Sequence, residues 1–257
     1  MPDAGQIHYR GSADRDRVND PLVLIHGAGG SSLHWPPEIR HLPGVSSLAI
    51  DLPGHGVSSG EEKGSIEAYS YAVLSFLDRM EINLVLLAGH SMGGAIAMRM
   101  SLDHPNRVKG LILVGSGAKL RVHPQLLEDC RREETYPKVI SQLLAWSFSP
   151  ATDQNLVRLA GKRMQDLPPS VLLADFKACD AFDIREQVGE ISQPTLIICG
   201  EDDQMTPVRF SQYLAEKIQG SRLEIIPGAG HMVMLEKPRI VAGLIGEFTG
   251  GLFAVGS

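Results

Sequence analysis

Six short apolar runs recur along the chain, and most are nearly continuous in leucine, isoleucine and valine rather than alternating with polar residues. They cover residues 21–25, 46–50, 84–88, 111–114, 195–198 and 223–226. Strands that are covered on both faces show this pattern, as in a parallel sheet with helices on each side. Residues 7–10 are expected to add an antiparallel edge strand.

Helical periodicity lies between these runs. Ser65 can cap a helix whose apolar face holds Ile66, Tyr69, Val73, Phe76, Leu77 and Met80. Further helices are expected over residues 92–102, 207–218 and 238–248, the last two opening with a proline. Strand and helix thus alternate along most of the chain, which predicts a mostly parallel, doubly wound α/β sheet.

Residues 119–187 break this alternation. They contain helix-like stretches at 126–130, 139–148, 156–164 and 171–182, separated by prolines, and no convincing strand. The segment leaves the sheet after the carboxyl end of a strand, the side on which open α/β sheets bind ligands. We therefore expect one α/β core, made of residues 1–118 and 188–257, with residues 119–187 inserted as a helical cap or lid.

Composition narrows the possible partners. The chain has 257 residues and a net charge of -6, and it has no lysine or arginine cluster of the kind that binds nucleic acid. No apolar stretch approaches the ~18 residues that span a bilayer. The polar amino-terminal residues lack a secretory pattern, and Cys130, Cys179 and Cys199 read as reduced thiols. A cytoplasmic protein is expected, with no signal for its oligomeric state.

The strongest chemical motif follows the third run. Gly89, His90, Ser91, Met92 and Gly93 form G-x-S-x-G between a strand and a helix. A serine on such a sharp turn is held strained and exposed above the sheet, and its close neighbours must be glycine. The alternative, an incidental serine in a glycine-rich turn, would not need this strand and helix. Ser91 is therefore predicted to be a catalytic nucleophile.

A serine hydroxyl needs a base, and a base needs an orienting acid. His231 follows the last apolar run and so lies at the same sheet edge as Ser91. The other histidines fall at edges or in loops without this placement, or, like His26, His55 and His90, are interpreted as structural. Three carboxylates compete as the acid after the fifth run: Glu201, Asp202 and Asp203.

The remaining parts of an acyl-transfer site can also be placed. Oxyanion donors are expected from the backbone N–H of Met92 and from the glycine-rich loop after the first run, with Ala28 the preferred donor. Glycines let a backbone approach a ligand closely, so Gly27 and Gly29 are expected beside the substrate. Trp146 and Phe148 of the cap and Met232 after the base are expected to line a mostly apolar pocket. The bland alternative is that these side chains only pack the cap against the core.

Several stretches together resemble the α/β-hydrolase superfamily, over about residues 7–248, and within it the carboxylesterase, enol-lactonase and C–C-bond hydrolase group. They are residues 26–31, 51–56, 89–94, 200–207 and 230–238. The resemblance implies that Asp203 is the acid and that residues 119–187 form a helical cap. It also implies that Asp51 and His55 belong to a structural turn and are not catalytic.

The expected activity is hydrolysis of a small-molecule carboxylic ester through an acyl-serine intermediate, without cofactor or metal. No cluster of residues has metal-ligand spacing, and the glycines at 27–30 depart from a dinucleotide fingerprint at Ser32. Two alternatives stay open. The same triad can cleave a C–C bond or an enol-lactone, and a capped pocket can serve a ligand-binding receptor that turns over slowly.

Overall fold

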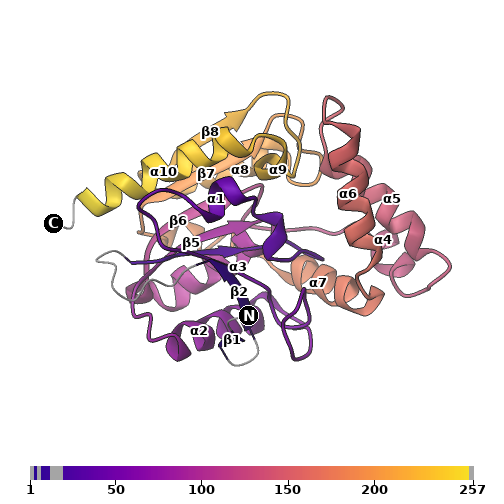
Figure 1. Ribbon diagram of the computed structural model, residues 1–257, viewed down its shortest axis with the longest axis horizontal. Helices are drawn as coiled ribbons and strands as arrows, with labels where there is room; N and C mark the ends of the chain where they lie inside the picture. The colour runs from indigo at the N-terminus through magenta and orange to yellow at the C-terminus, as the bar shows by residue number, and fades with distance from the viewer. Residues whose placement is uncertain (1–2, 5–6, 12–19, 255–257) are drawn as a thin grey trace.

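The computed structural model describes residues 3–4, 7–11 and 20–254 of the chain (Figure 1). In this part of the chain, strands form one sheet in the order β1-β2-β4-β3-β5-β6-β7-β8. Their bounds are β1 Asp3–Ala4, β2 Ile7–Gly11, β3 Leu22–Ile25, β4 Ser47–Ile50, β5 Val85–His90, β6 Val108–Val114, β7 Thr195–Gly200 and β8 Arg222–Ile226. Strands β3 to β8 pair in parallel, whereas β2 runs antiparallel to β4 and β1 antiparallel to β2. The predicted parallel sheet and its antiparallel strand at residues 7–10 are confirmed, although β1, and not β2, lies at the edge of the sheet.

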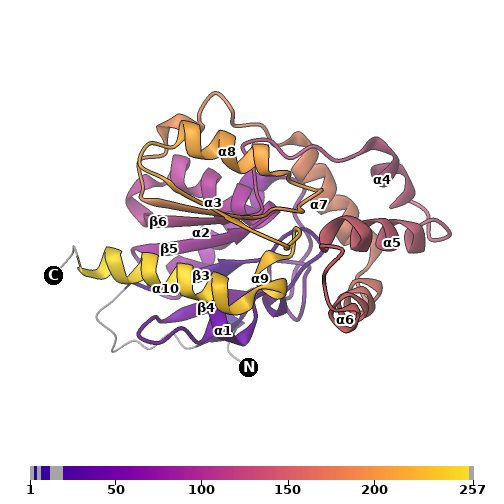
Figure 2. The same ribbon diagram turned by 90° about the horizontal axis from the view of Figure 1, so that it is seen from above.

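Helices cover both faces of the sheet (Figure 2). Helices α2, α3 and α8 lie on one side, and α1 and α10 lie on the other. The core helices and short turns are α1 Pro37–Arg40, α2 Ile66–Arg79, α3 Met92–Asp103, α8 Val208–Lys217, α9 Val233–Glu236, α10 Pro238–Ala254, and 3-10 turns at Ser32–His34, Pro105–Arg107 and Val188–Glu190. Ser65 caps α2, because its side chain accepts a hydrogen bond from the Ala68 N–H.

The two layers explain why the strands are continuously apolar. Neighbouring residues of a strand point to opposite faces of a sheet. In β3, Val23 and Ile25 join the core beneath α2, α3 and α8, whereas Leu22 and Leu24 join the core beneath α1 and α10. All four side chains are fully buried, so neither face of the strand tolerates a polar residue.

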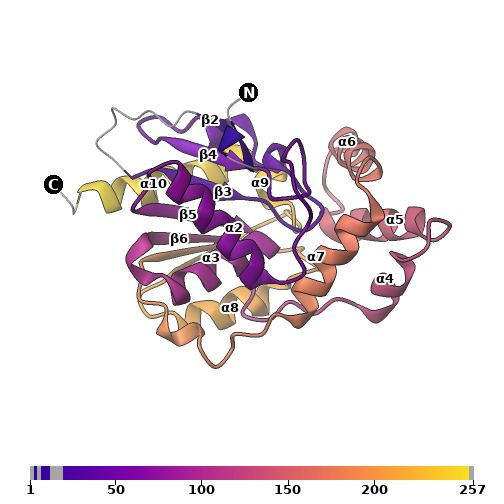
Figure 3. The same ribbon diagram turned by 90° about the horizontal axis from the view of Figure 1, so that it is seen from below.

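Four helices lie between β6 and β7 and form a separate group at one end of the molecule (Figure 3). They are α4 Pro124–Asp129, α5 Tyr136–Ser147, α6 Gln154–Gln165 and α7 Pro169–Ala181. This α4–α7 segment has an apolar cluster of its own, to which Ile140, Leu172 and Phe176 contribute. Its two connections to the core run side by side, joined by an antiparallel bridge between Lys119 and Asp183.

The strand order creates a topological switch point at the carboxyl ends of β3 and β5. After β3 the chain adds β4 on one side, and from β5 onward it builds outward on the other side. The loops that follow β3 and β5 therefore diverge, and a crevice forms where they part. Ile25 of β3 pairs with Gly89 of β5, and His90 of β5 pairs with Val114 of β6. The carboxyl ends of these three strands are therefore nearly level with one another.

The core is expected to be sensitive to loss of Phe76. This residue of α2 is fully buried, with its ring edge-on to Tyr9 at 5.8 Å between centroids. Phe76→Ala should lower the free energy of unfolding by about 3–5 kcal/mol, through lost burial and the cavity left behind. On the same helix, Tyr71 is 60% exposed, and Tyr71→Ala should cost about 1 kcal/mol or less. Denaturant unfolding measures both, and equal losses would contradict the assigned packing.

Candidate active site

Ser91 stands on a strained turn between β5 and α3. Its backbone has φ 52° and ψ -114°, a left-handed conformation that costs a residue with a side chain about 1–3 kcal/mol. Two hydrogen bonds hold the turn: the Ser91 N–H donates to the Val114 carbonyl at 2.9 Å, and the Ser116 hydroxyl donates to the Ser91 carbonyl at 2.8 Å. The surrounding backbone thus imposes the conformation that lifts Ser91 out of the helix.

The two glycines of the motif are required by close backbone contacts. A Cβ atom at Gly89 would lie 2.2 Å from the carbonyl oxygen of Gly93. A Cβ atom at Gly93 would lie 2.3 Å from the carbonyl oxygen of Ile25. These contacts are with backbone atoms, which cannot move aside as a flexible side chain can. The pattern read from the sequence therefore has a direct steric cause.

His231 and Asp203 form a buried pair beside this turn. Nδ1 of His231 lies 2.8 Å from Oδ2 of Asp203, and the residues are 3% and 4% exposed. Asp203 also accepts hydrogen bonds from the N–H groups of Met205 and Thr206 and from the Thr206 hydroxyl, at 2.8–2.9 Å. Burial acts to raise the pKa of Asp203, but the attraction of His231 and the donated hydrogen bonds outweigh it and lower the pKa. An ionised carboxylate only accepts, so it holds the proton on Nδ1 and leaves Nε2 of His231 free to act as a base.

The structure separates the three carboxylates that compete in the sequence. Asp203 is the one that contacts His231. Asp202 instead accepts a hydrogen bond from the Ser149 hydroxyl at 2.6 Å, at the end of α5. Glu201 is exposed to solvent.

The contacts of His90 are structural, in line with its interpretation from the sequence, and this histidine lines the same pocket as Ser91. Its Nε2 donates to the backbone carbonyl of His231 at 3.0 Å, and the two rings lie 4.6 Å apart. Burial and the nearby charge of His231 lower the pKa of His90, which keeps the ring neutral. His90 therefore fixes the loop that carries the base.

The loop after β3 is held by another neutral histidine. Nδ1 of His26 donates to the carbonyl of Gly27 at 2.8 Å, while Nε2 accepts from the N–H of Leu52 at 3.0 Å. Burial, reinforced by the neighbouring His55, lowers the pKa of His26, as a ring with one donor and one acceptor requires. The N–H of Gly30 also donates to the Gly27 carbonyl, at 3.0 Å.

Two backbone donors remain available in this region. Within the described part of the chain, the N–H groups of Ala28 and Met92 have no hydrogen-bond acceptor. Ala28 lines the pocket together with Ser91, and Met92 follows Ser91 at the start of α3. These are the two positions at which the sequence predicts oxyanion donors.

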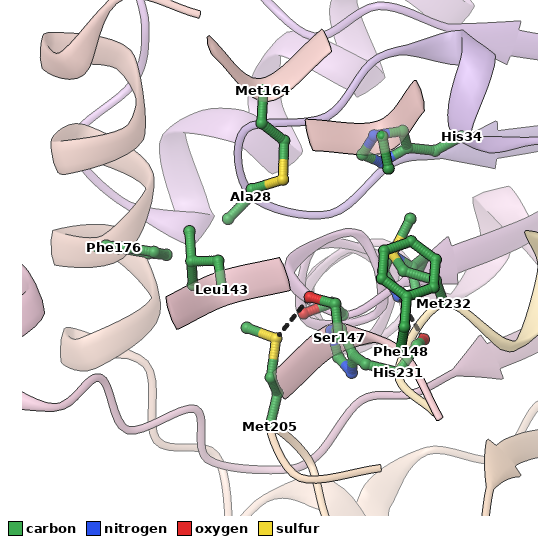
Figure 4. Close-up of a pocket in the computed structure, with 13 residues that line it drawn as sticks. Ala28, His34, Leu143, Ser147, Phe148, Met164, Phe176, Met205, His231 and Met232 are labelled. Atoms are coloured by element: carbon green, nitrogen blue, oxygen red, sulfur yellow. Dashed lines mark hydrogen bonds between the residues drawn. The ribbon is translucent and has the colours of Figure 1, made fainter. Parts of the chain in front are cut away.

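An apolar pocket lies over Ser91 and His231. Figure 4 shows side chains of the α4–α7 segment, among them Leu143, Met164 and Phe176, gathered around the same space as Met205, His231 and Met232 of the core. The cavity has a volume of about 50 Å³, the space of a few water molecules. A small group fits next to Ser91 while the segment lies as it does here.

The expected pocket residues divide into two groups. Phe148 and Met232 line the cavity. Trp146 is absent from its lining and instead packs half-buried against the apolar cluster of the α4–α7 segment. Gly27 lies behind the pocket against His90, and Gly29 borders a neighbouring cavity of about 360 Å³.

His34 is a pocket residue that no sequence pattern indicates. It lies in the wall between the two cavities and lines both. Its Nδ1 is buried without a partner in the described part of the chain. Burial and the charge of Arg163 lower the pKa of His34 to about 4, so the ring is neutral near pH 7. Its position in a loop gives no periodic or motif signal.

Three further properties concern the described residues only. None of their clusters of histidine, cysteine, aspartate and glutamate has the arrangement of a metal site. None of their helices combines the length and apolar character needed to cross a membrane. All three cysteines are buried and free.

Known proteins resemble this chain over most of its length. The family model described as alpha/beta hydrolase fold matches residues 20–238. A pimeloyl-[acyl-carrier protein] methyl ester esterase of Neisseria meningitidis is 29% identical over 246 residues, 90% of this chain and 77% of that protein. The solved structure of a thermophilic esterase is 31% identical with a TM-score of 0.81, covering 96% of this chain and 98% of that chain.

A likeness of fold alone extends further. The enol-lactonase from Burkholderia xenovorans LB400 has a TM-score of 0.87 at 23% identity, with 94% of this chain and 95% of that chain covered. The family match spans the parallel strands β3 to β8 and the loops that carry Ser91, Asp203 and His231. On this evidence the protein is a hydrolase that belongs to the alpha/beta hydrolase fold family.

Proposed function

We propose that the protein hydrolyses carboxylic esters through an acyl-serine intermediate. Ser91 Oγ attacks the ester carbonyl while Nε2 of His231 takes the serine proton, and Asp203 keeps the imidazole oriented. The C–O bond of the ester then breaks, and His231 returns the proton to the leaving alcohol. In the second half, a water molecule attacks the acyl-serine and gives a proton to His231. The bond between the acyl carbon and Ser91 Oγ then breaks, His231 returns the proton to Oγ, and the acid is released.

The observation that carries this proposal is the arrangement around one pocket. A strained serine, a histidine held by a buried carboxylate 2.8 Å away, and two unpaired backbone N–H groups meet at the same sheet edge. The N–H groups of Ala28 and Met92 would stabilise the negative charge that develops on the carbonyl oxygen. Relatives that are named as esterases support the same reaction.

The pocket favours a small uncharged acyl group. Its lining is mainly apolar, and the space beside Ser91 is about 50 Å³. We infer that the α4–α7 segment acts as a cap, because Leu143, Phe148 and Phe176 come from it and close the pocket from above the sheet edge. The core, residues 1–118 and 188–257, would then carry the chemistry.

Ser91 is expected to form the covalent adduct. An organophosphonate should label this residue, and Ser91→Ala should abolish both labelling and ester hydrolysis, since no other oxygen nucleophile sits on the strained turn. Ser147→Ala is the matched control, because Ser147 also lines the pocket. Mass spectrometry of the labelled peptide decides between them. Labelling of Ser147, or full activity in Ser91→Ala, would overturn the assignment.

Asp203→Asn is expected to lower kcat by several orders of magnitude, up to about 10⁴-fold, because an amide cannot hold the proton on Nδ1 of His231. Asp202→Asn should stay within about tenfold of the wild type, since Asp202 bonds Ser149 and not the histidine. Steady-state hydrolysis of an aryl ester measures both variants. The assignment is wrong if the two effects are reversed.

The lining of the pocket is expected to select the acyl chain. Leu143→Ala should raise kcat/KM for longer acyl groups relative to acetate by roughly 10-fold or more, as methylene-sized changes in apolar pockets are worth about 1–3 kcal/mol. Trp146→Phe, on the same helix but outside the lining, should leave the chain-length profile unchanged. An acyl-length series from acetate to octanoate tests both. A uniform fall at every length in Leu143→Ala would instead indicate a purely structural side chain.

A further inference from the structure

The α4–α7 segment places a fully buried carboxylate against the core, and the proposed reaction does not use it. Asp175 lies on α7 and is 0% exposed. Its Oδ1 accepts a hydrogen bond from the Tyr69 hydroxyl at 2.6 Å. Its Oδ2 lies 2.8 Å from Nε2 of His55 and accepts the N–H of Gly29 at 2.8 Å. All three partners belong to the core.

The contacts of His55 show that this carboxylate takes part in a buried ion pair. Nε2 of His55 faces the Asp175 carboxylate, and Nδ1 lies 3.0 Å from the carbonyl oxygen of Pro53. Both oxygens can only accept, so both ring nitrogens carry a proton and the ring is an imidazolium. Consistent with this, burial disfavours the charged ring, but the hydrogen bond and charge of Asp175 outweigh it and raise the pKa of His55.

The third partner connects Asp175 to the loop that holds Ala28. Three of the four residues at positions 27–30 are glycines, and Gly29 has φ +64°. Such a loop has many accessible backbone conformations, so it must be fixed from outside. His26 fixes the Gly27 carbonyl, which belongs to the same peptide unit as the Ala28 N–H. Asp175 fixes the N–H of the next peptide unit, that of Gly29.

These two restraints act on either side of Ala28, and they come from different parts of the molecule. The His26 restraint is internal to the core, and it is present wherever the α4–α7 segment lies. The Asp175 restraint exists only while α7 is packed against the core. Without it, the peptide unit between Ala28 and Gly29 is free to rotate, because it is joined on one side to the flexible Gly29.

We propose that Asp175 is a positioning residue that couples closure of the α4–α7 segment to formation of the oxyanion hole. The proposal rests on the proposed function, because it assigns the Ala28 N–H to the oxyanion. Closure of the segment over a substrate brings Asp175 to the Gly29 N–H and fixes Ala28 in the orientation that stabilises the tetrahedral intermediate. Opening of the segment removes that restraint, so an open enzyme is a poor catalyst even with its triad intact.

The test compares variants of one helix. Asp175→Ala removes the acceptor, and Asp180→Ala is the matched control, because Asp180 lies on α7 and bonds the Val122 N–H without contacting the glycine loop. Asp175→Asn is the conservative variant, since its amide oxygen can still accept the Gly29 N–H. For each, kcat and KM are measured with an aryl acetate, and the affinity is measured for a small trifluoromethyl ketone, whose adduct with serine carries an oxyanion.

Asp175→Ala is expected to lower kcat by roughly 10- to 100-fold, less than the direct loss of an oxyanion donor. KM should change less than about threefold, and affinity for the ketone should fall by about the same factor as kcat, because the interaction is made in the transition state. Asp175→Asn should recover most of the loss, and Asp180→Ala should match the wild type. Thermal unfolding identifies variants that fail to fold. If Asp175→Ala is one of these, Asp175→Leu, which also removes the acceptor but fills its space, should show the same loss of kcat with KM little changed.

Three results would overturn it. One is a match in kcat between Asp180→Ala and the folded variant that lacks the acceptor. Another is a rise in KM by the same factor as the fall in ketone affinity, with kcat unchanged, which would show that Asp175 serves substrate binding alone. The third is a loss of kcat in Asp175→Asn equal to that in Asp175→Ala, which would show that catalysis does not depend on the hydrogen bond to the Gly29 N–H. Phosphonate labelling of Ser91 in the wild type tests the proposed function separately, so its failure is distinct from these results.

Discussion

The catalytic edge depends on how closely its backbone segments approach one another. At Gly89 and Gly93 a methyl group would lie within 2.3 Å of a carbonyl oxygen of a neighbouring segment. The same crowding recurs at Gly200, against the carbonyls of Ala229 and Gly230, and at Gly230, against the end of α5. Because these backbone segments touch without side chains between them, the loops after β3, β5, β7 and β8 lie close enough together to form one site. A serine, a histidine and a carboxylate on separate strands can then share one site.

Neighbouring buried histidines at this edge have opposite protonation states. His26 and His90 each have a lowered pKa, because burial penalises the charged ring. His26 needs an unprotonated nitrogen to accept the Leu52 N–H, and Nδ1 of His90 has no partner in the described part of the chain. His55 lies 4.9 Å from His26 between ring centroids, yet its pKa is raised, because a buried carboxylate faces it. The deciding factor is the hydrogen-bond partner of each nitrogen and not the depth of burial. The single buried cation in this group is therefore fixed by one residue, Asp175.

The sequence predicts the sheet, the order of its elements and the position of Ser91, because these follow from local patterns. Continuous apolar runs report two-sided burial, and the G-x-S-x-G spacing reports a steric requirement of one turn. The pocket is harder to predict. Trp146 lies in the last turn of α5, whereas Phe148 follows the end of the helix with an extended backbone, and only Phe148 lines the cavity. His90 and Asp175 have hydrogen-bond partners far away in the sequence, for which a single chain gives no local signal.

The bridge between Lys119 and Asp183 has a consequence for how such a fold can diversify. The α4–α7 segment departs from the core and returns to it through neighbouring residues, so its two ends are already joined in space. A segment attached in this way can change in length or helix number without pulling on β6 or β7. The segment can then be exchanged while the core stays the same. A replacement module needs only to close at the same bridge and to supply an acceptor for the Gly29 N–H, which leaves the rest of its surface free to evolve toward new substrates.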